Sequence, residues 1–372
     1  MKQGYAKRAL VALFLALIYV PTLVGLAAGD RFRSENLENR TLAKLPALSL
    51  DAVPDLPGAF EAYYADNQPF RDQLIYVRAL MHKALYDRDI SRKVVFGKQD
   101  WMFYSCVADG APIDSYRGED LYTNVELRQI ASNLVRTRDD LKKIGCDFVL
   151  FIAPNKERVY SEYMPDRYGA PGQDYGVKQL VRFLRQRTDL KVVYCYDEIM
   201  QGRQDFPDLP LYFSRDTHWN DIGGYIGTRA LMRALDIDLP PLTRDMIAPS
   251  DRKAPFDMTI LSHLTRLYPL DPCYDVTLPE DALPTPDIPK KTLYFRHDSF
   301  GGYMTGFMAP WFAENGITEA SERDDAQVDA AHPDVFVMEV LERFVRRRLW
   351  LGPLYASPEN REAAAPEQIE DT

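Results

Sequence analysis

The chain has 372 residues and a formal net charge of −10 at pH 7. Hydrophobic residues make up 46% of the sequence and charged residues 27%, which is typical of an ordered globular protein and not of a disordered or fibrous chain. This length allows one large domain or two modest ones, each with a hydrophobic core. The negative charge argues against broad attraction to nucleic acid, which requires a positive surface.

Two local features of the composition narrow the possibilities further. The four cysteines, Cys106, Cys146, Cys195 and Cys273, have no C-x-x-C spacing, which excludes a zinc knuckle or a thioredoxin-type motif and leaves disulfide pairing open. The basic clusters within 182–187 and 343–348 are expected to be solvated helix faces.

Residues 9–28 form an uncharged, apolar stretch that can span the hydrocarbon core of a membrane, about 30 Å, as a helix. Three basic residues precede it, so residues 1–8 are expected to stay in the cytoplasm and the remainder to cross the membrane. A proline and three small residues near the end of the stretch also fit a signal-peptidase site. Its length favours a permanent single-pass anchor over a cleaved signal peptide.

The chain after this stretch divides into a lead-in region, a main domain and a tail. Residues 29–90 begin polar and proline-punctuated and continue with apolar residues at helical spacing, which predicts a linker followed by helices. Residues 91–350 show the patterns of a folded domain. Residues 351–372 are acidic, rich in Ala and Pro and without periodicity, which predicts disorder.

Within the main domain, apolar strand-like runs alternate with helical patterns. Residues 94–104 (VVFGKQDWMFY) predict a hairpin. The helices that follow are expected at 125–144, 174–187 and 221–235, and the strands at 146–154, 191–197, 291–298 and 334–340. Apolar strands that alternate with helices are typical of a parallel sheet covered on both faces. The sequence therefore predicts a three-layer α/β/α fold with a mainly parallel sheet.

In sheets of this kind, ligands bind at the carboxyl ends of the strands. The polar residues expected at those ends are Asn155 with Lys156, Asp197 with Glu198, Asp298 with Ser299, and Glu339. Lys156 and Arg158 are candidates for substrate binding, although a solvated loop explains them equally well. Glu339 and Arg343 are expected to act in structure or in positioning the substrate.

The segment 212–220 (YFSRDTHWN) places Asp216, His218, Trp219 and Asn220 in a loop just before the third expected helix. A carboxylate two residues from a histidine can hold the imidazole in one tautomer, as a general base requires. Most single histidines serve packing or a surface hydrogen bond. Here an acid, an imidazole, an indole and an amide lie within five positions, so the loop is expected to carry chemistry.

The segment 296–302 (RHDSFGG) ends an apolar strand with a serine that two glycines follow closely. A nucleophilic serine needs a sharp turn that exposes its hydroxyl, and small neighbours let backbone N–H groups approach an oxyanion. An Asp-Ser pair at a strand end would by itself be an ordinary turn. Combined with the loop of Asp216 and His218, it predicts that Ser299 is a nucleophile.

These motifs resemble those of the SGNH-hydrolase-like alginate and exopolysaccharide O-acetyltransferases (AlgJ/AlgX-like), whose hallmarks are a D-x-H-W-N loop and a later D-S-F strand end. The similarity covers most of the chain. It includes residues 38–40, 66–71, 97–103, 154–160, 216–220, 298–300 and 334–344. The resemblance implies an SGNH-hydrolase-like domain that transfers acyl groups.

The resemblance also implies roles for individual residues. Ser299 would be the nucleophile that accepts the acyl group, His218 the general base and Asp216 the carboxylate that orients it. The order Asp, His, Ser is permuted relative to common esterases of the superfamily, but such sets are recognised by roles and not by order. Weaker candidates for oxyanion or substrate binding are Tyr303, Gly301, Lys156, Asn220 and Arg296.

His297 departs from the family pattern, in which many members have glycine before the Asp-Ser pair. Its bulk is expected to crowd the turn or to alter the oxyanion hole. It also suggests a metal site with Asp216, His218 and Asp298 as fellow ligands. Because this set has no known zinc spacing and would leave Ser299 unexplained, neither a metal nor another cofactor is expected.

The function implied by the resemblance is O-acetylation of an exported polysaccharide in the periplasm, as in alginate biosynthesis. The acetyl donor would reach the enzyme through a multi-pass membrane O-acyltransferase in the inner membrane. Two alternatives stay open: a polysaccharide O-acetylesterase, which uses water as the acceptor, and a non-catalytic polysaccharide-binding or scaffold subunit of a secretion complex. No nucleic acid partner is expected.

Overall fold

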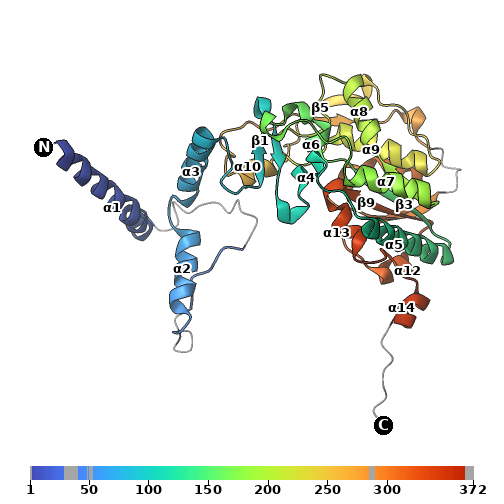
Figure 1. Ribbon diagram of the computed structural model, residues 1–372, viewed down its shortest axis with the longest axis horizontal. Helices are drawn as coiled ribbons and strands as arrows, with labels where there is room; N and C mark the ends of the chain where they lie inside the picture. Colours follow the sequence, from blue (N-terminus) through green and yellow to red (C-terminus); the bar gives the residue numbers. More distant parts are fainter. Residues whose placement is uncertain (1, 29–40, 48, 50–52, 285–289, 365–372) are drawn as a thin grey trace, which may run out of the picture. The chain divides into compact units, whose positions relative to one another are not determined.

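The computed structural model describes residues 2–28, 41–47, 49, 53–284 and 290–364 (Figure 1). The chain forms two compact units. One consists of Met1–Ser91 with Thr259–Tyr268, and the other of Arg92–Met258 with Pro269–Thr372. Every residue predicted to take part in chemistry lies in the second unit.

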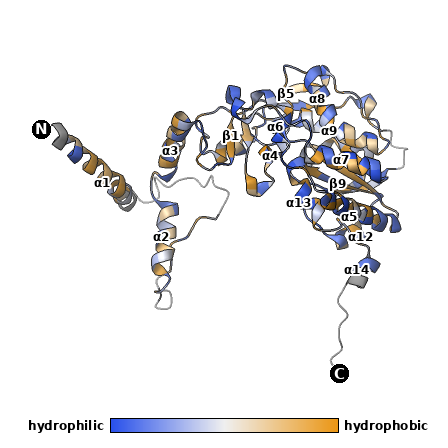
Figure 2. Ribbon diagram, viewed as in Figure 1, coloured by the Kyte–Doolittle hydropathy of each residue, from blue (hydrophilic) through white to orange (hydrophobic). Residues whose placement is uncertain are grey.

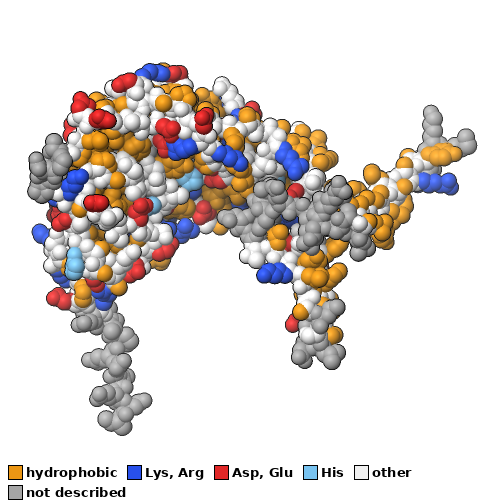
Figure 3. Space-filling view, turned by 180° about the vertical axis from the view of Figure 1, so that it is seen from behind, with side chains coloured by type: hydrophobic (Ala, Val, Ile, Leu, Met, Phe, Trp, Pro, Cys, Tyr) orange, Lys and Arg blue, Asp and Glu red, His pale blue; other side chains and the backbone are white. Residues whose placement is uncertain are grey.

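The first unit begins with a long apolar helix, α1 (Lys2–Ala28). Its stretch Tyr5–Val24 is long and apolar enough to cross a membrane. Hydrophobic residues run along the helix in the ribbon (Figure 2), and their side chains are seen in the space-filling view (Figure 3). This finding confirms the predicted N-terminal apolar helix as a candidate membrane span, although α1 starts seven residues before the expected residue 9.

Two further helices of the first unit, α2 (Leu56–Asn67) and α3 (Arg71–Tyr86), lie where helical spacing predicted them. The N–H of Ala43 donates a hydrogen bond of 2.8 Å to Asp66 Oδ2, and Asn67 Nδ2 donates one of 2.9 Å to the Ala43 carbonyl. These contacts fasten the preceding segment to α2. Residues 29–40, which include 38–40 of the family resemblance, lie outside the described residues.

The second unit is built around a five-stranded parallel sheet in the order β4-β3-β9-β7-β8. Its strands are β3 (Asp147–Ala153), β4 (Lys191–Tyr194), β7 (Lys291–Arg296), β8 (Phe312–Ala320) and β9 (Val335–Leu341). Because all strands run the same way, their carboxyl ends share one edge. The last strand in the sequence, β9, pairs in register with β3 from Asp147↔Val335 to Ala153↔Leu341.

Helices cover both faces of this sheet (Figure 1). One face packs against α5 (Asn124–Lys143), α7 (Gly176–Arg187), α12 (Asp325–Ala331) and α13 (Val345–Trp350), and the other against α8 (Tyr196–Asp205) and α9 (Asp221–Ala234). Successive strand residues point to opposite faces of the sheet. Leu150 therefore packs in the core on the side of α5 and α7, and Phe151 packs in the core on the side of α8 and α9. Burial on both faces explains why the central strands β3 and β9 are almost entirely apolar (Figure 2). The predicted three-layer α/β/α fold is confirmed.

Two small antiparallel sheets and several short helices lie outside the main sheet. The hairpin expected at 94–104 consists of two antiparallel strands, and a second antiparallel pair lies later in the chain. These strands are β1 (Val94–Phe96), β2 (Met102–Tyr104), β5 (Ile247–Ser250) and β6 (Cys273–Val276). The short helices are α4 (Pro112–Arg117), α6 (Lys156–Val159), α10 (Asp257–Leu261), α11 (Thr305–Met308) and α14 (Pro358–Ala364).

Three details of the sheet differ from the prediction. The strand expected at 191–197 ends at Tyr194, and Asp197 and Glu198 lie in the first turn of α8. Glu339 lies inside β9 and not after it. The edge strand β8 was not predicted, because its sequence FAENGITEA is half polar and lacks the apolar run of the central strands.

The tail also differs from the prediction of disorder after residue 350. Leu354 and Tyr355 are buried in the core beside α5, and the Leu354 N–H donates a 2.8 Å hydrogen bond to Thr137 Oγ1. The helix α14 follows, and residues 365–372 lie outside the described residues. Burial of these two apolar side chains holds the segment on the domain, although its polar composition had suggested disorder. The four cysteines carry free thiols.

Candidate active site

The loop between α8 and α9 carries the predicted acid and histidine, and it is folded back on itself. Tyr212 and Trp219 form an antiparallel bridge. The Phe213 N–H donates to the His218 carbonyl at 3.1 Å, and the Asn220 N–H donates to the Leu211 carbonyl at 3.0 Å. The loop therefore has the ladder of a small hairpin, which limits the positions its side chains can take.

A buried lysine fastens the same loop to the end of β3. Lys156, which is 2% exposed, donates from Nζ to the carbonyl oxygens of Phe213 (3.1 Å), Ser214 (3.2 Å) and Asp216 (2.6 Å). Burial lowers the pKa of Lys156. Its three donors are all used within the protein, where they hold the loop in place, and substrate binding by Lys156 stays a prediction.

Asp216, His218 and Ser299 form a continuous chain of hydrogen bonds. Asp216 Oδ1 lies 2.6 Å from His218 Nδ1, and His218 Nε2 lies 2.7 Å from Ser299 Oγ. A carboxylate accepts only if Nδ1 carries a proton, which leaves the lone pair of Nε2 facing the serine hydroxyl. Asp216 is fully buried, while Ser299 is exposed to solvent. This geometry is that of a serine activated by an oriented base.

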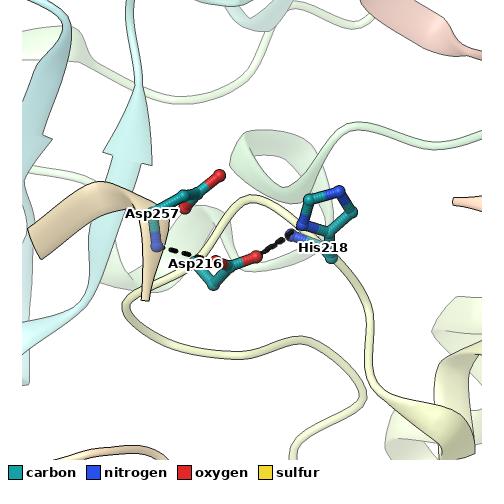
Figure 4. Close-up of side chains that lie close together, drawn as sticks. All are labelled: Asp216, His218 and Asp257. Atoms are coloured by element: carbon teal, nitrogen blue, oxygen red, sulfur yellow. Dashed lines mark hydrogen bonds and ion pairs between the residues drawn. The ribbon is translucent and has the colours of Figure 1, made fainter. Parts of the chain in front are cut away.

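Asp257 supports Asp216 from the start of α10 (Figure 4). Its N–H donates a 2.8 Å hydrogen bond to Asp216 Oδ2, and its carboxylate accepts from the N–H (3.0 Å) and hydroxyl (2.7 Å) of Thr217. Burial, and then the charge of Asp216, raises the pKa of Asp257 to about 6. Burial opposes ionisation of Asp216 too, but His218 and the Asp257 N–H outweigh it and lower the pKa of Asp216 to about 2. Asp216 therefore stays ionised.

The three side chains in Figure 4 also hold donor atoms within 4.8 Å of one another, a spacing that could hold a metal ion. Their lone pairs already have partners: Asp216 bonds His218 and the Asp257 N–H, and both Asp257 oxygens accept from Thr217. The donor set thus fits the chain of hydrogen bonds from Asp216 through His218 to Ser299 better than it fits a metal centre. We call this chain of hydrogen bonds the relay. The metal interpretation based on His297 shares Asp216 and His218 with this group, but its other two side chains, His297 and Asp298, do not belong to it.

The turn that presents Ser299 is tied to β9 by two acidic side chains. The Asp298 N–H donates to Glu339 Oε2 at 2.9 Å, and the Asp298 carboxylate accepts from the N–H groups of Phe300 (3.0 Å) and Leu341 (2.8 Å). Burial, and then the charge of Asp298, raises the pKa of Glu339 well above its usual range. Glu339 is fully buried. Burial thus favours the neutral form of Glu339, which supports the turn from below through the Asp298 N–H.

His297 is accommodated because residue 301 is glycine. A Cβ added at Gly301 would lie 2.4 Å from His297 Cβ and 2.5 Å from its Cγ. The His297 ring is fixed by Asp298 O (2.6 Å from Nδ1) and Glu319 Oε2 (2.9 Å from Nε2). His297, which stands where many family members have glycine, thus fits because Gly301 has no side chain.

The weaker candidates separate into two groups. Tyr303 lies beside the relay, with its ring centroid 6.0 Å from that of His218. Burial, with the nearby charge of Asp216, raises its pKa, so the hydroxyl stays a donor at neutral pH. Gly301 also lies at the site, and its N–H donates to the Asp298 carbonyl at 3.2 Å, so its role in binding an oxyanion stays a prediction.

Asn220 and Arg296 are not at the reacting atoms. Asn220 caps α9, accepting from the N–H of Ile222 (3.0 Å) and Gly223 (3.2 Å), and its amide donates to the Pro210 carbonyl at 2.6 Å. Arg296 is buried and donates to the Leu354 carbonyl on the other face of β7. The structure therefore does not bring these two side chains to Ser299.

Two supporting residues were missed by the sequence reasoning. Asp257 follows the loop by some forty positions in a segment without a recognisable motif, so no local signal marks it. Asp271 accepts hydrogen bonds from Ser214 Oγ (2.5 Å) and the Arg215 N–H (2.9 Å) and pairs with the Arg215 guanidinium (2.7 Å). Both are long-range contacts, which spacing along the chain does not reveal.

Part of the second unit matches the model of a known protein family. Residues 94–256 match the family model described as "SGNH hydrolase-like domain, acetyltransferase AlgX". This part of the chain is therefore similar to an SGNH hydrolase-like domain. The match includes Asp216 and His218 and ends before Asp257 and Ser299. It confirms the resemblance drawn from the D-x-H-W-N loop.

Individual relatives of the SGNH hydrolase-like domain are distant. The probable alginate O-acetylase AlgJ of Pseudomonas putida is 27% identical over 227 residues, which are 60% of this chain and 54% of the relative. The chain thus spans about half the length of the curated relative it matches.

Solved structures with a similar backbone include three bacterial proteins. The O-acetyltransferase domain of Pseudomonas putida AlgJ has a TM-score of 0.44 at 19% identity, covering 68% of this chain and 92% of that one. Bacillus cereus PatB1 with a sulfonyl adduct has 0.45 at 12%, covering 70% and 99%. Pseudomonas aeruginosa AlgX has 0.40 at 15%, covering 69% and 66%.

Proposed function

We propose that this protein is an O-acetyltransferase that carries the acetyl group on Ser299 as an acyl-enzyme. The observation that supports the proposal most directly is the chain of hydrogen bonds from Asp216 through His218 to Ser299, at 2.6 and 2.7 Å. Each residue has the environment its role needs: a buried, ionised carboxylate, an imidazole in one tautomer and an exposed hydroxyl.

In the first half-reaction, His218 Nε2 takes the proton from Ser299 Oγ as the oxygen attacks the carbonyl carbon of the acetyl donor. The bond between that carbon and the leaving group then breaks, and the leaving group receives the proton from Nε2. Asp216 stabilises the imidazolium between these events, since its charge lies 2.6 Å from Nδ1.

In the second half-reaction, a hydroxyl of the acceptor gives its proton to Nε2 and attacks the acetyl-serine, and Ser299 leaves with the proton. The negative charge on the tetrahedral oxygen needs a donor. Within the described residues the Ser299 N–H donates no other hydrogen bond, and the Tyr303 hydroxyl has no partner. These two groups are the proposed oxyanion donors.

We further propose that the acceptor is an exported, alginate-like polysaccharide and that the reaction takes place in the periplasm. The name of the AlgJ relative supports the acceptor, and α1 supports a membrane-tethered domain outside the cytoplasm. A donor made in the cytoplasm would have to be relayed by a multi-pass O-acyltransferase in the inner membrane. An open, solvent-exposed serine suits a polymer better than a small buried substrate.

The catalytic role of Ser299 is tested with a chromogenic acetyl ester. The full chain in detergent should release the chromophore, and Ser299→Ala should lose the activity by about 10³-fold or more. Ser321→Ala, which removes another exposed hydroxyl after β8, is the matched control and should keep it. Full activity in Ser299→Ala would sink the assignment and would favour a non-catalytic scaffold.

Hydrolysis is the second candidate function, because water reaches the exposed Ser299 as readily as a sugar hydroxyl does. The two functions change the polymer in opposite directions. In cells that carry His218→Ala, the O-acetyl content of the secreted polysaccharide should fall if the protein is a transferase and rise if it is an esterase. Unchanged acetylation would contradict both.

A further inference from the structure

A hollow of about 430 Å³ lies at the carboxyl end of β7 and is lined by four arginines. These are Arg296, Arg323, Arg347 and Arg348. Among the described residues that line it, Glu322 is the one carboxylate. Residues 352–354, in the segment that leads to α14, close one side. Such a local excess of positive charge is unexpected in a chain whose net charge is −10.

The hollow lies on the opposite face of the sheet from the Ser299 relay. Phe295 packs in the core with Trp219 and Phe300, whereas Tyr294 packs in the core with α12 and α13. Because side chains alternate along a strand, Arg296 shares the face of Tyr294. The hollow and the relay are thus two separate features at one edge of the sheet.

Arg296 is the deepest charge in the hollow, and its own chain does not neutralise it. It is 6% exposed, and its Nη1 donates a hydrogen bond to the Leu354 carbonyl at 3.2 Å. Its Nε is buried and has no acceptor among the described residues, and no described carboxylate pairs with it. Burial, and then the charge of Arg348, lowers its pKa, and the charge of Glu322 offsets part of this effect. A buried cation without a carboxylate paired to it is unfavourable unless something else supplies the charge.

The other arginines are held at the rim by partners that leave donors free. Arg348 pairs at 3.3 Å with Glu322, whose side chain is 79% exposed, so this pair is weak. Arg347 pairs at 3.5 Å with Asp109 and is 56% exposed. Arg323 is fixed more firmly, by Asp325 (2.5 Å) and the Pro353 carbonyl (2.7 Å). The guanidinium groups are therefore oriented but not saturated.

We propose that this hollow is an anion-binding site that takes a single oxyanion group, either the carboxylate of an acidic sugar or a phosphate. Arginine presents a planar fork of donors that matches both groups, and a bound oxyanion would supply the charge that Arg296 lacks. The basic cluster of α13, expected from the sequence to be a solvated helix face, is thus half of a binding site. The proposal does not depend on the chemistry at Ser299.

The test is calorimetric titration of the full chain in detergent with two probes, sodium phosphate and sodium glucuronate, at low ionic strength. At least one probe should bind. Arg348→Gln and Arg296→Met should each weaken binding by about 10-fold, as expected when a charge-assisted hydrogen bond is lost. Binding of phosphate alone identifies a phosphate site, binding of glucuronate alone a uronate site, and binding of both the shared oxyanion chemistry.

The matched control is Arg244→Gln, which removes the same charge from an exposed pair with Asp208 outside the hollow. It should bind like the unaltered protein. Arg348→Gln keeps the proposal testable if Arg296→Met does not fold, and it should retain ester hydrolysis because Arg348 lies apart from the relay. The proposal is overturned if neither probe binds, or if Arg348→Gln and Arg244→Gln bind alike.

Discussion

The amino group of Lys156 lies 2.6 Å from the backbone carbonyl oxygen of Asp216. Two more carbonyl oxygens of the same loop, those of Phe213 and Ser214, accept from it as well. A single buried cation thus sets the path of the backbone on which the acid and the histidine are mounted. The position of His218 relative to Ser299 therefore depends on Lys156.

Lys156→Met should lower both stability and activity. Methionine fills a similar volume but leaves three carbonyl oxygens without their donor, at a cost of about 3 kcal/mol in the free energy of unfolding. The ester-hydrolysis rate should fall because the loop loses its anchor. Lys178→Met, whose exposed amino group contacts only the Gln173 carbonyl, is the control and should change neither quantity. Unfolding in urea and initial rates provide the two measurements.

Gly301 and Gly302 are neighbours that differ in the space available for a side chain. A Cβ at Gly301 would meet His297 at 2.4 Å, while one at Gly302 would meet nothing within 4 Å. Gly301→Ala should therefore displace the Ser299 turn, destabilise the protein by about 1–3 kcal/mol and lower activity, while Gly302→Ala should do neither. The double variant with His297→Gly should recover much of the loss. Equal effects of the two alanines would rule out the His297 contact as the cause.

The sequence was sufficient to predict the fold, for a physical reason. Central strands such as β3 and β9 are buried on both faces and so read as continuous apolar runs, whereas the edge strand β8 does not. The tail around Tyr355 was misjudged because two buried side chains are too few to dominate a composition.

The site was predicted only where its chemistry is local in the sequence. Asp216 and His218 lie two residues apart, so their hydrogen bond could be anticipated. The Asp257 contact joins residues 41 positions apart and depends on how α10 is placed, which no spacing rule gives. Lys156 was found, but its contacts with the loop were not anticipated, because a lysine after a strand looks the same in sequence whether it faces solvent or the loop.

The pair of Asp216 and Asp257 predicts a dependence of stability on pH. The pKa of Asp257 is raised to about 6 in the folded state, above the value of about 3.9 expected for an unfolded chain. The contribution of Asp257 to the free energy of unfolding is therefore fully present below about pH 4 and is lost as the pH rises through 6. The pKa of Asp216 is lowered to about 2, so its contribution is present above about pH 4 and is lost as the pH falls towards 2.

Asp257→Asn should remove the first of these effects and leave the second. The free energy of unfolding of the unaltered protein should decline by up to about 3 kcal/mol between pH 4 and 7 relative to the variant, since a shift of one pKa unit corresponds to about 1.4 kcal/mol. Asp251→Asn, an exposed acid, is the control and should follow the unaltered protein. Parallel stability curves for the Asp257→Asn and unaltered proteins would falsify the raised pKa.

Glu339 gives the last prediction, because its protonation state decides which substitution it tolerates. Its raised pKa favours the neutral form of the side chain, with Oε2 accepting from the Asp298 N–H at 2.9 Å. Glu339→Gln keeps a neutral acceptor of the same shape and should hydrolyse the chromogenic ester at close to the original rate. Glu339→Leu also packs into the strand but leaves the Asp298 N–H without an acceptor, which costs about 1–3 kcal/mol. Its rate should fall by about 10-fold through displacement of Ser299, seen as a lower kcat with little change in KM. If Glu339→Gln is as impaired as Glu339→Leu, then Glu339 is charged in the folded protein and supports the turn electrostatically.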